Sequence, residues 1–378
     1  MSRIAVLGAG AWGTAIALSL SRRGGHNITL WSHSVEEARQ IADARENILF
    51  LPGFPLPADI AITASEEGIR DAEIVVSVIP SEFLRVTFAR LRPFLRQGQI
   101  IVSATKGVED RTFLRMTEVI GACLGEPQDG DSGPGKKRAA NPDTHLEVFV
   151  EAGAPEVSSS GIPPAPRDGN DGAFHIGALS GPSFAIEVAQ AQPTAITVAF
   201  HDPAIATRVQ NEFSSEALRL YTTTDVVGVE LGGALKNVIA IAAGVAAGVG
   251  LGYNSAAALM TRGIAEITRL AVACGGLRET LAGLTGTGDL VLTCTGSLSR
   301  NRTVGQALGQ GRKLPEILAS LGGKVAEGVL TTRAALGLAR RHNIEMPITE
   351  QMELILDAGK DPREAIKDLM LRPGRDEQ

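Results

Sequence analysis

A chain of 378 residues exceeds what one hydrophobic core usually supports, so two domains are expected. Its 44% hydrophobic content is typical of a globular protein, and its net charge of -6 argues against a nucleic-acid partner, because phosphates attract basic surfaces. Cys123, Cys274 and Cys294 lie far apart without a CxxC pair, which argues against a metal site or disulfide framework and favours the cytoplasm.

No pattern in the sequence indicates export or membrane insertion. The first eight residues run straight into a strand-like pattern and leave no room for a signal peptide. The most apolar segment, residues 238–251, is too short and too rich in glycine to span a bilayer comfortably. We therefore expect a protein without a membrane span.

The first 110 residues alternate short β-branched runs with segments of helical spacing. The runs at 4–7, 28–31, 74–78 and 100–103 predict buried strands, and the segments 14–23 and 35–47 predict helices. This alternation is typical of a Rossmann-type α/β fold with a doubly wound parallel sheet.

Residues from about 126 to 173 interrupt the alternation. They are rich in glycine, proline and serine, and nine acidic residues face four basic ones. Such a segment buries too little apolar surface to offset its chain entropy, so we expect a disordered or loosely held insertion rather than a folded module.

Strand patterns resume after this segment and then give way to helices. Residues 175–179, 194–199 and 218–221 predict strands. Helical patterns follow at 231–249, 255–274, 278–284, 302–310, 314–321, 331–341 and 349–356, and Asp361-Pro362 is typical of the start of a last short helix. We expect a dinucleotide-binding domain at 1–222, interrupted at 126–173, and a mainly α-helical substrate or catalytic domain at 223–378.

A glycine-rich turn follows the first predicted strand. Gly8, Gly10 and Gly13 form GxGxxG, and the first predicted helix follows them. In this context the glycines provide a tight turn, room for a pyrophosphate and close helix packing, and the amides at the helix start stabilise phosphates. The turn therefore predicts binding of NAD or NADP.

The second predicted strand lacks the acid that usually binds the ribose 2′-hydroxyl of NAD. The chain reads Trp31-Ser32-His33-Ser34, and the first acid is Glu36. A 2′-phosphate would meet no repulsion and could contact His33, which slightly favours NADPH. The alternative is that His33 is a solvated turn residue.

Lysine is rare in this chain, since only eight of the 36 basic residues are lysines. Lys106 follows the strand predicted at 100–103, at the sheet edge where open α/β sheets bind ligands. Lys236 lies on an otherwise small and apolar helix beside Asn237. Burial would lower its pKa and suit it to proton exchange with a substrate oxygen, whereas the alternative is an ordinary surface lysine.

Two further segments carry polar groups suited to a small substrate. Asp289 lies in a segment, 284–290, that its flanking glycines predict to be a loop, where an aspartate is most often a turn or N-cap residue. Ser299, Arg300 and Asn301 combine a guanidinium with neutral donors, a set that suits a phosphate monoester.

Together these motifs resemble the NAD(P)-dependent sn-glycerol-3-phosphate dehydrogenase family, particularly its bacterial type. The matching stretches occur in the expected order and cover essentially the whole chain outside the insertion: GAGAWGTA from Gly8, SATKG from Ser103, SGPSFAIE from Ser180, LGGALKNVIAIAAG from Leu231, NSAAALMTRGIAEITRL from Asn254, GTGDLVLTCTGSLSRNR from Gly286 and VAEGVLTT from Val325.

The resemblance implies reversible hydride transfer between NAD(P)H and dihydroxyacetone phosphate, giving glycerol 3-phosphate for glycerophospholipid synthesis. Lys236 would be the general acid/base and Asp289 would position it. The implied substrate-binding residues are Lys106, Gly181, Ser183, Lys236, Asp289, Ser299, Arg300 and Asn301. The implied cofactor-binding residues are Gly8, Gly10, Ala11, Trp12, Gly13, His33, Lys106, Ala185, Arg300, Val325 and Glu327. A homodimer is expected from family habit alone.

Two departures and two rival functions accompany this resemblance. The family pattern often has Asp where this chain has Tyr253. Family members also usually lack the insertion at 126–173. If this insertion folded over the cleft between the two domains, turnover or regulation could change. Another dehydrogenase of the same plan, acting on a hydroxy acid or sugar acid, is the enzymatic rival. A non-catalytic dinucleotide sensor is the other, although it would predict loss of Lys236 or Asp289.

Overall fold

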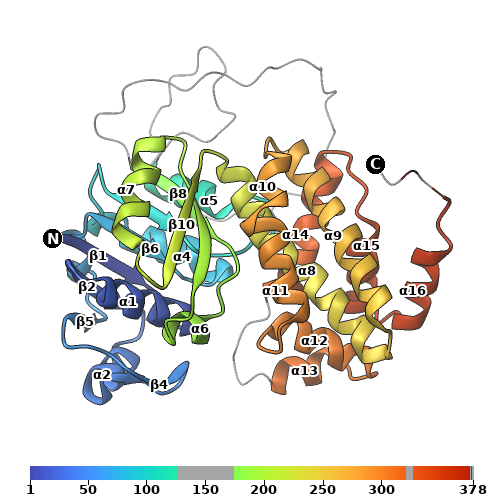
Figure 1. Cartoon of the computed structure of the whole chain (residues 1–378), viewed down its shortest axis with the longest axis horizontal. Helices are drawn as coiled ribbons and strands as arrows, with labels where there is room; N and C mark the ends of the chain where they lie inside the picture. The colour runs from blue at the N-terminus through green and yellow to red at the C-terminus, as the bar shows by residue number, and fades with distance from the viewer. Residues whose placement is uncertain (126–173, 321–326, 375, 377–378) are drawn as a thin grey trace, which may run out of the picture.

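The computed structural model describes residues 1–125, 174–320, 327–374 and 376, and it has two halves that lie side by side (Figure 1). A twisted sheet with its helices forms one half, and a bundle of helices forms the other. The insertion expected at 126–173 lies outside the described residues.

One eight-stranded sheet organises the first half. Its order is β10-β9-β8-β7-β6-β1-β2-β5. The strands are β1 (Ser2–Leu7), β2 (His26–Trp31), β5 (Ile60–Thr63), β6 (Ile74–Ser77), β7 (Ile100–Ser103), β8 (His175–Ser180), β9 (Thr194–Ala199) and β10 (Leu218–Thr223). The seven predicted strands are confirmed. The short edge strand β5 was missed, as was the hairpin of β3 (Glu46–Asn47) and β4 (Leu51–Pro55).

Helices cover both faces of this sheet, as a doubly wound fold requires. Alternate side chains of β1 face opposite ways: Ile4 and Val6 belong to one hydrophobic cluster, and Ala5 and Leu7 belong to another. The helices of this half are α1 (Ala11–Arg23), α2 (Val35–Ala44), α3 (Glu67–Arg70), α4 (Ser81–Leu91), α5 (Met116–Leu124), α6 (Ala185–Ala189) and α7 (Pro203–Phe213).

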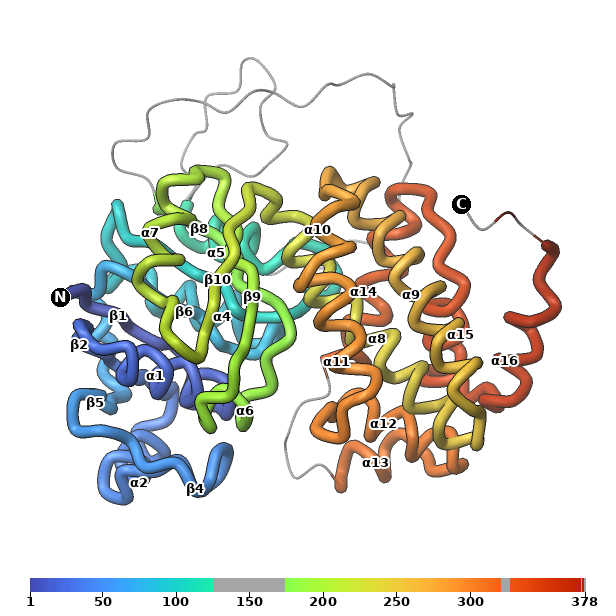
Figure 2. Tube along the Cα trace, in the orientation of Figure 1, coloured from blue at the N-terminus to red at the C-terminus, as the bar shows by residue number. Residues whose placement is uncertain are grey.

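The sheet is parallel from β5 to β8 and then reverses. β9 pairs with β8 in antiparallel register, whereas β9 and β10 are parallel to each other. The Rossmann-like fold is therefore confirmed, with two reversed strands at one edge. Figure 2 shows these two strands, β9 and β10, side by side. Helix α8 packs against β8 and β9, so the helical half joins the sheet at this reversal.

The second half is built around α8 (Val226–Val249), and the predicted helices in it are confirmed. Its other helices are α9 (Tyr253–Ala273), α10 (Arg278–Ala282), α11 (Asp289–Thr295), α12 (Arg300–Gly309), α13 (Leu314–Ser320), α14 (Glu327–Arg341), α15 (Pro347–Asp357) and α16 (Pro362–Met370). By length and composition α8 could cross a membrane, but 94% of its most apolar stretch is buried, so α8 is a core helix of the folded protein.

Glycine brings α12 into close contact with α8. A Cβ on Gly305 would lie 1.9 Å from the carbonyl oxygen of Ile241, and a Cβ on Gly244 would lie 2.1 Å from that of Arg302. Only glycine, which has no Cβ, allows the two helices to come this close. The contact fixes where the first turn of α12, which begins at Arg300, lies relative to α8.

We expect Gly305→Ala to lower the free energy of unfolding by about 2 kcal/mol, measured by urea denaturation. Overpacking at this contact typically costs about 1–3 kcal/mol and outweighs the gain of up to ~1 kcal/mol in helix propensity. Gly374→Ala is the control, because no atom lies within 4 Å of its Cβ position. Equal stability of the two variants would contradict this account of the α8–α12 contact.

Candidate active site

Three charged side chains from distant parts of the chain meet between the two halves. The Lys236 Nζ atom lies 2.5 Å from Asp289 Oδ1, and the Lys106 Nζ atom lies 2.7 Å from Asp289 Oδ2. Asp289 is 1% exposed and Lys236 is 6% exposed. One buried carboxylate thus binds two ammonium groups, and Lys236 is not the surface lysine of the alternative interpretation.

The members of this cluster come from three different parts of the fold. Lys106 follows β7, at the carboxyl edge of the parallel strands, and Lys236 lies midway along α8. Asp289 begins α11, directly after a π-helical turn at Leu284–Gly288. The loop predicted at 284–290 is therefore wrong: Gly286 lets the chain coil against α10, since its Cβ would lie 2.0 Å from the carbonyl oxygen of Leu281. Such π-turns are frequent at functional sites.

Thr293 completes the cluster and was missed by the sequence analysis. Its hydroxyl accepts a hydrogen bond from Lys236 Nζ at 2.6 Å and donates one to the backbone oxygen of Asp289 at 2.6 Å. The i, i+4 spacing from Asp289 would have been a signal, but only once a helix rather than a loop had been predicted there.

Burial and charge set the protonation states. Burial lowers the pKa of Lys236 to about 8; the Asp289 carboxylate opposes this shift, and the Lys106 ammonium adds to it. Burial alone would raise the pKa of Asp289, but the two ammonium groups hold it below its usual range. Lys236 is thus mostly protonated at pH 7 yet able to release its proton.

The turn after β8 closes one side of the cluster. The carbonyl oxygen of Gly181 accepts hydrogen bonds from Lys106 Nζ at 3.4 Å and from Ser183 Oγ at 2.9 Å. Gly181 has a φ of 140°, and a Cβ there would lie 2.9 Å from the Cα of Ile196. The predicted residues Lys106, Gly181 and Ser183 therefore lie together.

Two buried polar atoms beside the cluster lack partners among the described residues. They are Nδ2 of Asn237, next to Lys236, and Oγ of Ser180, which lies 2.4 Å from the Cβ position of Gly233. Since buried polar groups are nearly always hydrogen-bonded, these two suit a polar ligand.

The start of α12 holds the predicted phosphate-binding residues. Ser299 is the N-cap and accepts from the amide of Arg302 at 3.2 Å, and Asn301 Oδ1 accepts from the amide of Gly328 at 3.1 Å. Arg300 is exposed. Its guanidinium interacts electrostatically with Glu327, at the start of α14, whose pKa burial raises despite Arg300, Lys106 and Lys236. Arg300 and Glu327 therefore border the cluster.

The glycine-rich turn has the geometry that a dinucleotide requires. Gly8 has a φ of 115°, and a Cβ on Gly13 would lie 1.9 Å from the carbonyl oxygen of Gly8. Gly10 is the N-cap of α1, and no atom lies within 4 Å of its Cβ position. No side chain caps the first amides of α1, which begins at Ala11. The residues present therefore fit a pyrophosphate.

Asn47, also missed by the sequence analysis, supports this turn. It is buried, and its Nδ2 donates to the carbonyl oxygen of Ala9 at 2.7 Å and to Thr14 Oγ1 at 2.8 Å. No short-range pattern links Asn47 to the turn, because the contact spans 38 positions.

The remaining predicted cofactor residues are more dispersed. Trp12 and Ala185 are partly buried and pack against the same sheet-side hydrophobic cluster. His33 is exposed after β2, while Glu36 pairs with Arg39 at 3.0 Å. Among the described residues, His33 makes no hydrogen bond or ion pair with the lysine cluster. Val325 lies outside the described residues.

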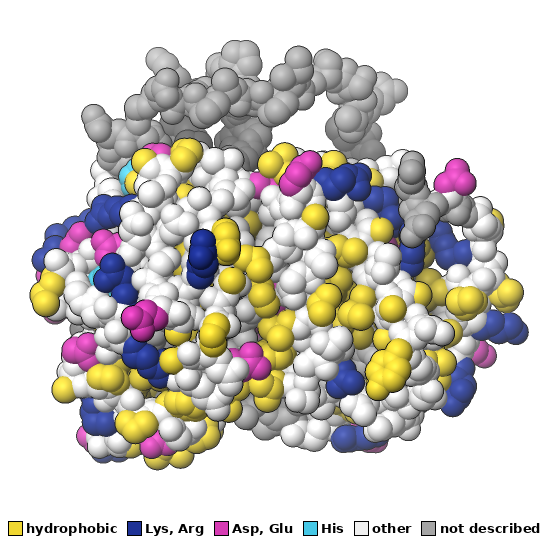
Figure 3. Space-filling view, viewed as in Figure 1, with side chains coloured by type: hydrophobic (Ala, Val, Ile, Leu, Met, Phe, Trp, Pro, Cys, Tyr) yellow, Lys and Arg dark blue, Asp and Glu magenta, His cyan; other side chains and the backbone are white. Residues whose placement is uncertain are grey.

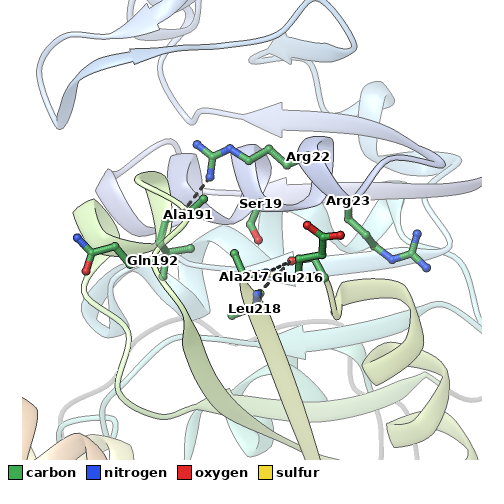
Figure 4. Close-up of a pocket in the computed structure, with 10 residues that line it drawn as sticks. Ser19, Arg22, Arg23, Ala191, Gln192, Glu216, Ala217 and Leu218 are labelled. Atoms are coloured by element: carbon green, nitrogen blue, oxygen red, sulfur yellow. Dashed lines mark hydrogen bonds between the residues drawn. The ribbon is translucent and has the colours of Figure 1, made fainter.

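Acidic and basic side chains are interspersed on the face of the molecule seen in Figure 3. A cavity of about 450 Å³ lies elsewhere, between the end of α1 and the loops before β9 and β10 (Figure 4). Arg22, Gln192 and Glu216 line it, but none of the predicted site residues does, so we do not assign the active site to it.

Comparisons with known proteins match the whole chain. The N-terminal model of the NAD-dependent glycerol-3-phosphate dehydrogenase family matches residues 3–133 and 168–206, and the C-terminal model matches 225–367. Glycerol-3-phosphate dehydrogenase (NAD(P)+) of Koribacter versatilis is 53% identical over 378 residues, covering 100% of this chain and 99% of that one. Its counterpart in Acidobacterium capsulatum is 52% identical over 381 residues, covering 100% of both.

Solved structures agree with these matches. The crystal structure of glycerol-3-phosphate dehydrogenase from Coxiella burnetii has 32% sequence identity and a TM-score of 0.82, covering 98% of this chain and 99% of that one. A ketopantoate reductase from Ralstonia eutropha is 12% identical with a TM-score of 0.56, covering 96% and 99%, and this likeness concerns the fold alone.

We expect Asp289→Asn to lower the free energy of unfolding by about 3–5 kcal/mol, because it leaves two ammonium groups without their buried carboxylate. Adding Lys236→Met should recover part of this loss, since one of those charges is then gone. Asp357→Asn is the control: it breaks a partly exposed pair with Arg333, worth at most about 1 kcal/mol. Urea denaturation measures all three, and similar losses in both single variants would refute the buried cluster.

Proposed function

Because the chain belongs to the NAD-dependent glycerol-3-phosphate dehydrogenase family, we propose that it interconverts dihydroxyacetone phosphate and sn-glycerol 3-phosphate. It is an NAD(P)-dependent oxidoreductase, in agreement with relatives at 45–53% identity that carry this name. The single observation that carries the proposal is the buried Lys106–Asp289–Lys236 cluster at the carboxyl edge of a dinucleotide-binding sheet.

Lys236 is the general acid for ketone reduction. Negative charge develops on the ketone oxygen as the carbon accepts a hydride, and the ammonium of Lys236 donates the proton that completes the hydroxyl. In the reverse direction the neutral amine removes that proton. A pKa of about 8 serves both directions near neutral pH. Nicotinamide, when bound, supplies or takes up the hydride.

Asp289 and Thr293 hold Lys236 in place for this transfer. Both accept hydrogen bonds from its Nζ atom, so the remaining N–H of the ammonium is free to point towards a substrate oxygen. Lys106 binds the other carboxylate oxygen and lies beside the Gly181–Ser183 turn, where it adds positive charge for the anionic substrate. The unpartnered amide of Asn237 is placed to donate to a substrate hydroxyl or carbonyl oxygen.

The substrate phosphate binds at the start of α12. Arg300 offers an exposed guanidinium there, and the helix N-terminus adds a partial positive charge. Ser299 also caps α12, and Asn301 also accepts a hydrogen bond from the amide of Gly328. We therefore assign to each of them both a structural role and a role in binding the substrate. Arg300 also reaches the cofactor side through Glu327, while Trp12 and Ala185 complete the cofactor pocket.

NADPH is the preferred cofactor in this proposal. The residue after β2 that would bind the ribose is not a carboxylate: Ser32 donates to Glu37, and Glu36 is neutralised by Arg39. His33 is exposed there and available to a 2′-phosphate. The relatives' names allow both NAD and NADP.

Family membership also supports a cytoplasmic location, a homodimer and a role in glycerophospholipid synthesis. The three cysteines are free thiols, which agrees with a reducing compartment. Light scattering on the purified protein tests the dimer directly.

The test of the reaction is oxidation of NADH and of NADPH with dihydroxyacetone phosphate, by wild type and by Lys236→Met. We expect the variant to lose about 10²–10⁴-fold in kcat, the usual contribution of a general acid, while it still binds NADPH. Lys313→Met, at an exposed lysine, is the matched control and should keep full activity. A folded, nucleotide-binding wild type without turnover would overturn the proposal and favour a dehydrogenase of another substrate or a sensor.

The pH dependence provides a separate test of the acid. The ammonium form of Lys236 predominates below pH 8 and is lost above it, so kcat/KM for ketone reduction, which reports ionisation of the free enzyme, should fall about tenfold per pH unit well above pH 8. The oxidative rate needs the neutral amine and should rise with pH before levelling near pH 8. Profiles that are flat from pH 6 to 10 in both directions would exclude Lys236 as the group that exchanges the proton.

A further inference from the structure

We propose that Phe113 and Arg341 are positioning residues for Lys106, because they fasten the segment that carries Lys106 to the helical half. We call residues 106–117 the strap. The strap follows β7 and so belongs to the sheet half by sequence, yet its side chains are anchored on α8, α11 and α14. The inference deepens the proposed function and rests on it for its kinetic consequences only.

The middle of the strap packs against α14. The ring of Phe113 lies against Gly337, where a Cβ would come within 2.2 Å of a ring carbon. The guanidinium of Arg341 covers the same ring at 4.4 Å from its centroid and donates to the carbonyl oxygen of Thr112 at 3.0 Å. Val108 is a buried member of the hydrophobic core of the helical half. A glycine, an aromatic ring and a cation therefore form one fitted contact.

The end of the strap is bonded to α8. Glu230, buried on that helix, accepts from Arg115 Nη1, from the amide of Thr117 and from its hydroxyl, each at 2.7 Å. This carboxylate therefore caps the N-terminus of α5, which begins at Met116, from the opposite half of the molecule. Glu230 precedes Lys236 on α8, so the strap and the general acid share one rigid support.

Two residues in the middle of the strap have unfavourable backbone conformations. Arg111 has a φ of 71° and Phe113 a φ of 60°, in the left-handed region that bulky side chains rarely adopt. Such conformations persist only where the surroundings enforce them. The Phe113 amide donates to the carbonyl oxygen of Glu109 within the strap, and Gly337 and Arg341 hold the Phe113 ring from α14. Without the contact to α14 we expect the strap to lose its fixed position relative to the helical half.

The strap is also attached to the sheet half. Glu109 pairs with Arg85 of α4 at 2.6 Å, and a Cβ on Gly107 would lie 2.7 Å from the Cβ of Ser81. The strap is therefore a segment that contacts both halves of the molecule. Lys106, at its first position, reaches Asp289 only as long as that docking holds.

Releasing the strap has a consequence that a purely structural contact would not have. The charged and titratable groups that face Lys236 are Lys106 from the strap, Asp289 and the Cys294 thiol from α11, and Glu327 from α14. Lys106 lowers the pKa of Lys236 by like-charge repulsion. If Lys106 moves away, the pKa of Lys236 rises, and the alkaline limb of the reductive pH profile moves to higher pH.

The experiment compares Arg341→Ala with Arg340→Ala, adjacent exposed arginines on α14 of which only Arg341 contacts the strap; Arg340 pairs with Glu353 instead. Phe113→Ala is the stronger variant, and Phe113→Leu tests partial rescue. In the full-length protein we expect Arg341→Ala and Phe113→Ala to lower kcat and to shift the alkaline limb upwards. Arg340→Ala should match wild type in both.

A second measurement does not depend on turnover. Lys106 is 18% exposed and paired, so an amine-reactive reagent read out by mass spectrometry should label it slowly in wild type and several-fold faster in Arg341→Ala, with the exposed Lys313 as internal reference. Unchanged labelling and an unchanged alkaline limb would overturn the proposal. If wild type fails to reduce dihydroxyacetone phosphate, the proposed function fails while the labelling still decides the role of the strap.

Discussion

The structure depends on one buried carboxylate that holds two ammonium groups. A charge removed from water costs several kcal/mol unless it is paired, so Lys236, in the middle of an apolar helix, requires Asp289. Asp289 in turn binds Lys106, which comes from the sheet. This single requirement brings β7, α8 and α11 to one point between the halves. Burial at this point lowers the pKa of Lys236 although Asp289 opposes the shift, and a lowered pKa is the property that proton exchange needs.

The rest of the helical half serves to place this cluster. Glycines at the α8–α12 contact set the position of Arg300 beside it, and the π-turn before α11 sets the direction of Asp289. The strap connects the sheet to α8 and α14 through Phe113 and Glu230. These contacts are short-range, steric at the glycines and at Phe113 and hydrogen-bonded at Glu230, so small changes in them shift the charged groups of the cluster.

The nucleotide turn depends on backbone groups and hydrogen bonds rather than on buried charges. Its glycines leave amide groups open at the start of α1, and a buried amide side chain, Asn47, holds the turn from the other side. No buried charge is involved there. A pyrophosphate can therefore bind to backbone groups at this turn.

Local pattern in the sequence determined much of this protein: the seven main strands, the helical second half and the glycine turn. It also singled out Lys106 and Lys236 as candidate site residues. Each of these follows from periodicity, composition or a short motif. Only the tertiary structure decided the reversal of β9 and β10, the helical start at Asp289, and the bonds made by Thr293, Asn47 and Glu230. The physical reason is distance along the chain, because Lys106 and Asp289 are separated by 183 positions, and no local pattern records which buried groups will be paired.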